Sequence, residues 1–127
     1  MSPPRKRPKK LYDFLFSGNG YKVRLALSQL GIPVEYEFID LIQGKTRSEY
    51  FLAKNPMGQV PVLELEDGTL LRESNAILVW LAEGTELMPE NSEERAQVLQ
   101  WMFFEQSNID KNLGRCRFMA ILSLIHI

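Results

Sequence analysis

A proline inside an apolar stretch is the feature that most constrains what this chain can fold into. Pro61 interrupts residues 60–65, which otherwise have the composition of a strand and lead into the hairpin signal Asp67-Gly68. Proline has no amide proton for a sheet ladder, so it must lie at a sheet edge, at the start of a strand or in a cis turn. In the cis case, the amide and carbonyl of Val60 would face outward, free to pair with an extended peptide.

A helix is predicted directly after the hairpin. Glu73 and Ser74 precede an apolar run that reaches Gly84, and Ser74 has the side chain typical of a helix N-cap. Helix N-termini bind carboxylates, because their unpaired backbone amides and the helix dipole point at the anion. The segment therefore combines a peptide-pairing edge with an anion-binding position, which suits a small, extended, acidic peptide.

The residues before Pro61 supply the first half of an α/β fold. A strand is expected over residues 11–16, followed by a helix that opens at Asn19 or Gly20. The apolar face of this helix, spaced i, i+3, i+4 and i+7, consists of Val23, Ala26, Leu27 and Leu30. An edge strand over residues 34–40 is expected to point Val34, Tyr36 and Phe38 inward. Strand, helix and strand in this order predict a right-handed βαβ unit.

The expected order over residues 11–84 is β-α-β-α-β-β-α. Its second half consists of a short helix that ends at Asn55-Pro56, the strand that contains Pro61, the second strand of the hairpin and the helix that begins near Ser74. Residues 1–10 are proline-rich and basic and are predicted to form a disordered tail. Residues 85–91 are predicted to be a linker, and residues 92–118 a helix.

Residues 119–127 (MAILSLIHI) form an atypical apolar tail. Two interpretations are open for it. The tail is either a buried strand or helix that lacks its partner, or a remnant of a truncation or frameshift. We favour the remnant.

Charge and cysteine content narrow the function classes. The net charge is −1, but five of the 15 basic residues lie in residues 1–10, which leaves 10 basic against 16 acidic residues elsewhere, a net charge of −6. Nucleic-acid binding by the folded part is therefore not expected. The single cysteine, Cys116, excludes an internal disulfide and fits a cytoplasmic location. No apolar run approaches the ~20 residues that span a membrane, and the only histidine, His126, lies in the tail, so no metal site is expected.

Two motifs near Pro61 resemble the glutathione-binding half of the glutathione S-transferase superfamily. They are residues 55–63 (NPMGQVPVL) and residues 73–77 (ESNAI), and residues 17–25 (SGNGYKVRL) are most similar to bacterial members. The similarity extends over roughly residues 11–118. It implies a thioredoxin-like domain with a mixed four-stranded sheet, followed by a truncated all-helical domain, and a homodimer for a full-length relative.

The resemblance also implies glutathione as co-substrate, with no metal, and Ser17 as the catalytic hydroxyl. Ser17 would stabilise the glutathione thiolate, which attacks a hydrophobic electrophile. Lowering a thiol pKa from about 8.5 to about 6.5 requires roughly 2.7 kcal/mol. A hydrogen bond to a charged acceptor supplies ~1.5–3 kcal/mol, and a helix dipole ~0.3–1 kcal/mol. Asn19 is a further candidate contact to the thiolate, and Lys45 to the glycyl carboxylate.

The remaining roles follow from the same resemblance. Ser74 would bind the γ-glutamyl carboxylate and Glu73 its ammonium group. Gln59 and Val60 would meet the cysteinyl and glycyl portions, Val60 through its backbone, and Pro61 would be structural.

Simpler interpretations stay open for several of these residues. Ser17 and Asn19 fit a turn or a helix cap, Ser74 fits a plain N-cap, and Glu73 and Lys45 fit solvated surface residues. Because residues 17–20 (SGNG) contain no thiol, dithiol redox chemistry is disfavoured. The leading hypothesis is a glutathione transferase. The alternative is a non-catalytic glutathione-binding or protein-interaction module with a transferase-like fold, and isomerase or peroxidase chemistry on the same scaffold is not excluded.

Overall fold

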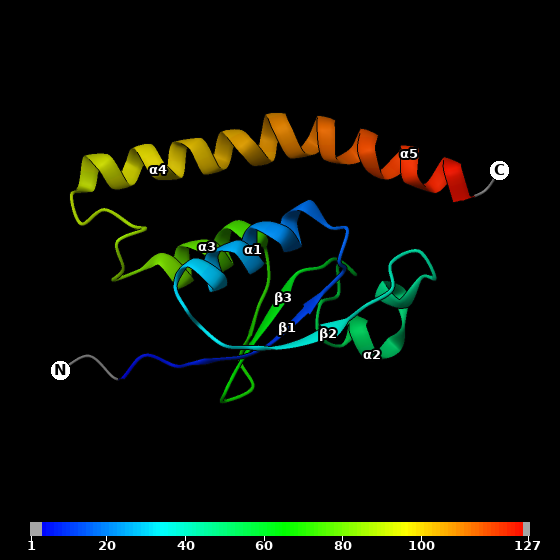
Figure 1. Cartoon of the computed structure of the whole chain (residues 1–127), viewed down its shortest axis with the longest axis horizontal. Helices are drawn as coiled ribbons and strands as arrows, with labels where there is room; N and C mark the ends of the chain where they lie inside the picture. Colours follow the sequence, from blue (N-terminus) through cyan, green and yellow to red (C-terminus); the bar gives the residue numbers. More distant parts are fainter. Residues whose placement is uncertain (1–3, 126–127) are drawn as a thin grey trace. The chain divides into compact units, whose positions relative to one another are not determined.

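The computed structural model describes residues 4–125, which divide into two compact units with a boundary between Leu81 and Ala82. The first unit contains four strands, two full helices and a short third helix (Figure 1). In chain order these elements are β1 (Pro8–Asp13), α1 (Gly18–Gln29), β2 (Glu35–Phe38), the 3₁₀ turn η1 (Lys45–Arg47), α2 (Glu49–Leu52), β3 (Val62–Leu65), β4 (Leu70–Leu71) and α3 (Ser74–Ala82). The predicted order of strands and helices is confirmed.

The four strands form one mixed sheet in the order β2-β1-β3-β4. Strands β1 and β2 are parallel, whereas β3 is antiparallel to both β1 and β4. Helices α1 and α3 cover one face of the sheet and α2 lies on the other (Figure 1). This is the thioredoxin-like arrangement that the sequence predicts.

The core lies mainly between the sheet and helices α1 and α3. It contains three of the four residues of the predicted α1 face, while the fourth, Leu30, is partly buried at the C-cap of α1. Together with residues from β1, β3 and α3, the core consists of Leu11, Val23, Ala26, Leu27, Leu63, Leu65, Ile77 and Leu81. A second cluster, under α2, consists of Tyr12, Ile39, Phe51 and Val62. Full burial of one such aliphatic or aromatic side chain contributes about 1.5–3 kcal/mol, so these two clusters are the main source of hydrophobic stabilisation in the unit.

Strand β2 differs from its prediction. Tyr36 and Phe38, expected to point inward, are each 58% exposed. The register pairs Tyr36 with the buried Leu11, so the two side chains share a face of the sheet, but at this edge no residue of β2 belongs to either buried cluster. Only Val34, just before the strand, packs partly against the core.

Strand β1 also differs from its prediction. It begins at Pro8 and ends at Asp13, whereas the sequence predicts that residues 11–16 form it. The predicted disordered tail is therefore wrong for residues 8–10, which pair with the neighbouring strands. Residues 4–7 have no regular secondary structure, but the Glu66 amide donates to the Arg7 carbonyl oxygen at 3.0 Å. Residues 1–3 lie outside the described part of the chain.

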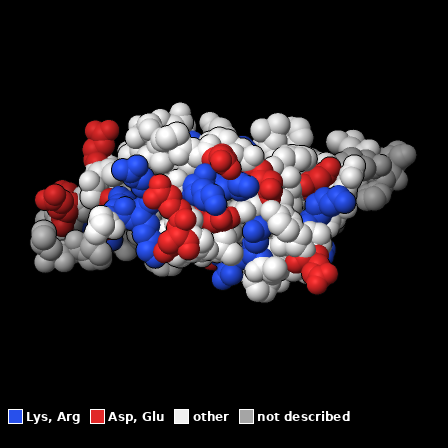
Figure 2. Space-filling view, turned by 90° about the horizontal axis from the view of Figure 1, so that it is seen from below, with Lys and Arg blue, Asp and Glu red and all other residues white. Residues whose placement is uncertain are grey.

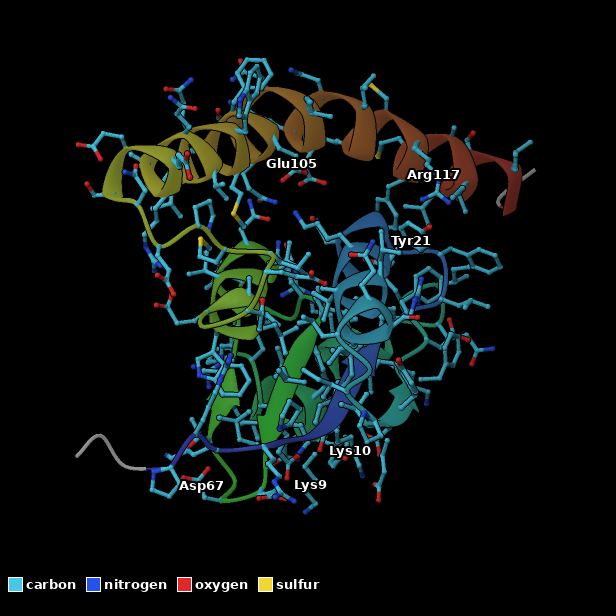
Figure 3. All side chains as sticks on the ribbon, turned by 60° about the vertical axis from the view of Figure 1, so that its left-hand side comes forward. Lys9, Lys10, Tyr21, Asp67, Glu105 and Arg117 are labelled. Atoms are coloured by element: carbon cyan, nitrogen blue, oxygen red, sulfur yellow. The ribbon has the colours of Figure 1, made fainter. Side chains whose placement is uncertain are left out.

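Basic side chains ahead of β1 contact the acidic turn of the β3–β4 hairpin. Lys6 donates to Thr69 Oγ1 at 3.2 Å and forms an ion pair with Asp67. The Arg5 guanidinium lies 4.6 Å from the centre of the Trp80 ring. Figure 3 shows Asp67 at the hairpin end of the unit, and Figure 2 shows basic and acidic side chains interleaved on one face of the molecule. The basic segment is thus held by charges that lie far away in the sequence.

The second unit is largely one helical stretch. Helix α4 (Ser92–Phe104) continues through the π-helical segment η2 (Glu105–Gly114) into α5 (Arg115–Ile125). Asn91, the last residue of the predicted linker, caps α4, since its Oδ1 accepts from the amides of Glu93 and Glu94, each at 3.0 Å. The predicted helix end at residue 118 is wrong, because the helix runs on to residue 125, while residues 126–127 lie outside the described part.

No side chain described between residues 92 and 124 is buried. Among the helices of residues 4–125, none is both long enough and apolar enough to cross a membrane.

Candidate functional site

The strand register brings three segments to one end of the sheet. Strand β1 runs into the turn that carries Ser17, and Tyr12 pairs with Val62, so the start of β3 lies beside the end of β1. Leu63 pairs with Leu71, so the end of β4 lies beside the start of β3. The β1–α1 turn, the proline turn and the start of α3 therefore share this end of the unit.

A hydrogen bond joins two of these segments directly. The Ser74 hydroxyl donates to Asn19 Oδ1 at 3.2 Å, which links the first turn of α3 to the first turn of α1. Ser74 is buried and Asn19 is half-buried. Two helix N-termini, each with backbone amides that have no partner within the helix, thus lie next to each other.

Ser17 is the N-cap of α1. Its Oγ accepts a hydrogen bond from the Gly20 amide at 3.1 Å, and its own amide donates to the Phe14 carbonyl oxygen at 2.8 Å. A hydroxyl has one proton to donate besides its acceptor capacity. Among residues 4–125, no acceptor engages the Ser17 hydroxyl proton. Capping and donation to a bound anion are therefore compatible at this residue.

The Val60-Pro61 peptide bond is cis, one of the three options that the sequence leaves open. Pro61 is buried, and no hydrogen bond from another described residue engages the Val60 backbone. Asn55 holds the loop that precedes this bond, because its Nδ2 donates to the Gln59 carbonyl oxygen at 2.8 Å and its Oδ1 accepts from the Met57 amide at 3.1 Å. The Val60 edge is therefore presented by a fixed loop. The sequence prediction uses Asn55 only as the end of the short helix and as the first residue of a motif, and does not predict that its side chain holds the loop.

Glu73 adopts an unusual backbone conformation at the start of α3. Its φ is 66°, the one positive value at a non-glycine residue in the described chain, and its carbonyl oxygen accepts the first helical hydrogen bond from Ile77 at 3.0 Å. Glu73 thus takes the cap position, and the prediction of Ser74 as N-cap is wrong, since Ser74 is the first helical residue. Residues held in the left-handed region cost about 1–3 kcal/mol and cluster at binding sites.

Lys45 is exposed at the start of η1, and only its backbone is fixed, through donation to the Asp40 carbonyl oxygen at 2.8 Å. Arg47 approaches the site loop more closely. A Cβ added at Gly58, whose φ is +63°, would lie 3.0 Å from Arg47 Nη1. Arg47 therefore lies beside the residue that precedes Gln59. The sequence gives no periodic or motif signal for this contact.

A partly buried ion pair lies beside the Ser17 turn. Asp13 is 5% exposed and pairs with Arg24. Burial raises the pKa of the Asp13 carboxyl, while the neighbouring Arg24 guanidinium and the Phe14 amide act in the opposite direction. Neither residue of this pair is singled out by the sequence, because nothing in the spacing of the two residues predicts their contact.

Together, these features define a thioredoxin-like protein that has no thiol at the start of α1. Ser17 and Gly20 stand at the two ends of the four-residue turn where a dithiol would lie, and Cys116, the only cysteine, is exposed in α5. The site combines a free serine hydroxyl, an unpaired backbone edge and two adjoining helix N-termini.

Comparison with known proteins identifies the family. The profile of the glutathione S-transferase N-terminal domain matches residues 11–89, and the chain belongs to the glutathione S-transferase family. The solved structure of a glutathione S-transferase from Pseudomonas fluorescens is 49% identical, with a TM-score of 0.86, and the match covers 90% of this chain and 57% of that one.

Two further relatives extend the comparison. Glutathione S-transferase 1 of Dianthus caryophyllus is 35% identical over 129 residues, which cover 98% of this chain and 56% of the relative. A glutathione transferase homologue from Sulfitobacter, solved with bound glutathione, is 30% identical with a TM-score of 0.72, over 77% of this chain and 48% of that one. The chain thus spans about half the length of these relatives.

Proposed function

We propose that this chain binds glutathione and, as part of a glutathione S-transferase, activates its thiol for attack on a hydrophobic electrophile. The observation that carries the proposal is the Ser17 hydroxyl, which caps α1 and keeps its proton unengaged by any acceptor in residues 4–125. Membership of the glutathione S-transferase family supports the proposal, as does the glutathione bound in the Sulfitobacter homologue.

The γ-glutamyl end of glutathione would occupy the start of α3. Its carboxylate would accept from the Ser74 amide and from neighbouring backbone amides, in the geometry that favours anions at helix N-termini, and from the Ser74 hydroxyl once that proton turns from Asn19 to the ligand. Glu73, held in its left-handed conformation, would face the ammonium group. The contact of Ser74 with Asn19 supports a shared site, because it joins this anion-binding position to the turn of Ser17.

The rest of the tripeptide would extend along the proline turn. The cysteinyl portion would pair with the Val60 backbone as an added strand, with Gln59 beside it and Pro61 fixing the turn. The glycyl carboxylate would then lie near the loop where Arg47 approaches Gly58, with Lys45 as the second candidate cation.

In the reaction, the glutathione thiol would lose its proton to solvent while Ser17 donates to the resulting thiolate. The sulfur then forms a bond to the electrophilic carbon, and the leaving group departs with its electron pair. A hydrogen bond to a charged acceptor is worth ~1.5–3 kcal/mol, which lowers a thiol pKa by about 1–2 units. The role of Ser17 is thus to keep the substrate thiol ionised near neutral pH.

Calorimetric titration with glutathione tests the proposal, with Ser17→Ala and Ser74→Ala beside the unsubstituted chain. Ser92→Ala is the matched control, since Ser92 also begins a helix but lies in the second unit. We expect binding to be lost in Ser74→Ala, roughly retained in Ser17→Ala and unchanged in Ser92→Ala. A folded chain that does not bind glutathione at all would refute the site assignment.

An activity assay with an activated aryl halide then separates the transferase from a non-catalytic glutathione-binding module. Thiolate formation that depends on Ser17, followed by turnover, is expected for the transferase. Binding without any acidification of the thiol would favour the non-catalytic module. A homodimer and a cytoplasmic location stay predictions for the whole protein.

A further inference from the structure

The partly buried ion pair beside the Ser17 turn has a geometry that packing alone does not require. Asp13, the last residue of β1, places Oδ2 2.5 Å from Arg24 Nη1 of α1. Its Oδ1 accepts a hydrogen bond from the Phe14 amide at 2.8 Å. Both carboxylate oxygens are therefore used, one by the helix and one by the first residue of the turn.

Gly20 makes room for this carboxylate. A Cβ added at Gly20 would lie 1.7 Å from Asp13 Oδ1, far inside van der Waals contact. Gly20 and Arg24 are four residues apart, so they share one face of α1. Glycine in a helix is unfavourable relative to alanine, and here the close approach of Asp13 explains its presence.

Arg24 also binds the backbone of the β1–α1 turn. Its Nη2 donates to the Leu15 carbonyl oxygen at 3.0 Å, while Nη1 contacts Asp13. The Ser17 amide in turn donates to the Phe14 carbonyl oxygen at 2.8 Å. The chain between β1 and α1 is thus bonded to the ion pair at residues 14 and 15, three and two residues before Ser17.

A purely stabilising role does not account for this arrangement. Buried ion pairs are often no more stabilising than apolar residues of similar volume. An apolar pair, however, could neither accept from the Phe14 amide nor donate to the Leu15 carbonyl. Lysine in place of Arg24 would keep the charge, but it lacks the planar fork that bridges two acceptors at once.

We infer that Asp13, Gly20 and Arg24 are positioning residues for Ser17, and that they set the acidity of the thiol bound beside it. The inference rests on the proposed function. These residues act through the turn and do not touch the substrate. Displacement of the turn by a few tenths of an ångström would lengthen the hydrogen bond from Ser17 to the thiolate while leaving the α3 and Val60 contacts in place.

The test is a pH titration of bound glutathione by its thiolate absorbance in the ultraviolet, on the full chain and on Arg24→Lys and Asp13→Asn. Arg95→Lys is the control, because Arg95 pairs with Glu83 at 2.6 Å in the second unit. We expect the thiol pKa to rise by about 1–2 units in the first two variants and to stay unchanged in the third. Affinity for S-methylglutathione, which has no thiol, is expected to change less than twofold in all three.

Combination with Ser17→Ala separates positioning from general damage to the fold. If Arg24 acts through Ser17, Arg24→Lys should raise the thiol pKa no further once Ser17 is alanine. Should Asp13→Asn fail to fold, the comparison of Arg24→Lys alone and with Ser17→Ala still decides the question.

The proposed function and the positioning role fail in different ways. If the unsubstituted chain binds no glutathione, or leaves the thiol pKa at its solution value, the proposed function fails and the positioning role with it. If the unsubstituted chain acidifies the thiol and Arg24→Lys does so equally, the proposed function stands and the positioning role is overturned. Additive effects of Arg24→Lys and Ser17→Ala would also overturn the positioning role and leave the proposed function standing.

Discussion

The two units of this chain place their apolar residues in opposite ways. In the first unit, the large side chains Leu11, Leu27, Phe51 and Ile77 are fully buried. In the second unit, aromatic and aliphatic side chains of the long helical stretch are exposed, Phe103 by 71%. The first unit is therefore specified by its own core, whereas the helices from residue 92 onward are specified by local terms, such as the Asn91 cap and the helical hydrogen bonds.

Truncation of core residues should expose this difference most strongly. Leu27→Ala and Ile77→Ala each remove a fully buried side chain from the α1–α3 face of the sheet, so we expect a loss of about 2–5 kcal/mol in the free energy of unfolding. Phe103→Ala, in α4, should change it by less than about 0.5 kcal/mol. Urea denaturation followed by circular dichroism measures both, and equal losses would contradict the contrast between the units.

Two glycines allow a matched test on a smaller scale. Gly20→Ala would drive a Cβ into Asp13, which is buried and bonded on both sides, and overpacking of this kind costs about 1–3 kcal/mol. In Gly114→Ala the nearest atom is the end of the half-buried Asp110 side chain, at 2.7 Å. That atom is the far end of a flexible side chain, so a small shift of Asp110 makes room, and the substitution should change stability by less than about 1 kcal/mol.

Thermal unfolding of both glycine variants measures the difference. A Gly20→Ala chain as stable as the unsubstituted one would show that the carboxylate does not pack against α1 as described.

Removal of the α4 cap should affect the helical unit alone. Asn91→Ala leaves two helix amides without their acceptor, so we expect a local loss of about 1 kcal/mol. Hydrogen exchange should speed up in the first turn of α4 and stay unchanged at residues 62–65 of β3. Faster exchange in β3 would mean that the cap also stabilises the first unit.

The pH dependence of stability should be sharper for the sheet than for the helix. The Tyr12 hydroxyl donates to Glu64 Oε2 at 2.5 Å, which lowers the pKa of Glu64, and burial together with this bond raises the pKa of Tyr12. The lowered Glu64 pKa contributes stability that is present above the ordinary glutamate value of about 4.3 and lost as pH falls further. The raised Tyr12 pKa contributes stability that is lost as pH rises above about 10.

Tyr12→Phe should flatten both limbs of the stability profile, measured as the midpoint of urea unfolding against pH. Ser92→Ala, which removes the hydrogen bond that lowers the pKa of the fully exposed Glu93, should leave both limbs nearly unchanged. If the two variants changed the pH dependence of the urea midpoint equally, the contrast between the sheet and the helix would be contradicted.

Much of the first unit could be predicted from sequence, because its signals are local. The face of α1, the hairpin at Asp67-Gly68 and the element order depend on periodicity and turn chemistry. The β1–β3 and β3–β4 registers then bring Ser17, Val60 and Glu73 to one end of the sheet. The association of the site segments is thus a consequence of the topology.

The errors lie where partners far apart in the sequence decide the structure. The segment before β1 is held by Asp67 and Glu66 of the hairpin, contacts that composition cannot reveal. Tyr36 shares a face of the sheet with the buried Leu11 but is exposed, because β2 is left uncovered at the sheet edge. The Asp13–Arg24 contact has no motif of its own, and the close approach that explains Gly20 is visible only in three dimensions.

The most direct test of the central claim is to map the binding of glutathione on the isotopically labelled chain by nuclear magnetic resonance. We expect amide shift changes at Ser17, Asn19, Val60 and Ser74, all within the first unit, and none in residues 92–125. Shift changes confined to the helical stretch, or no change at millimolar glutathione in a folded chain, would contradict the claim.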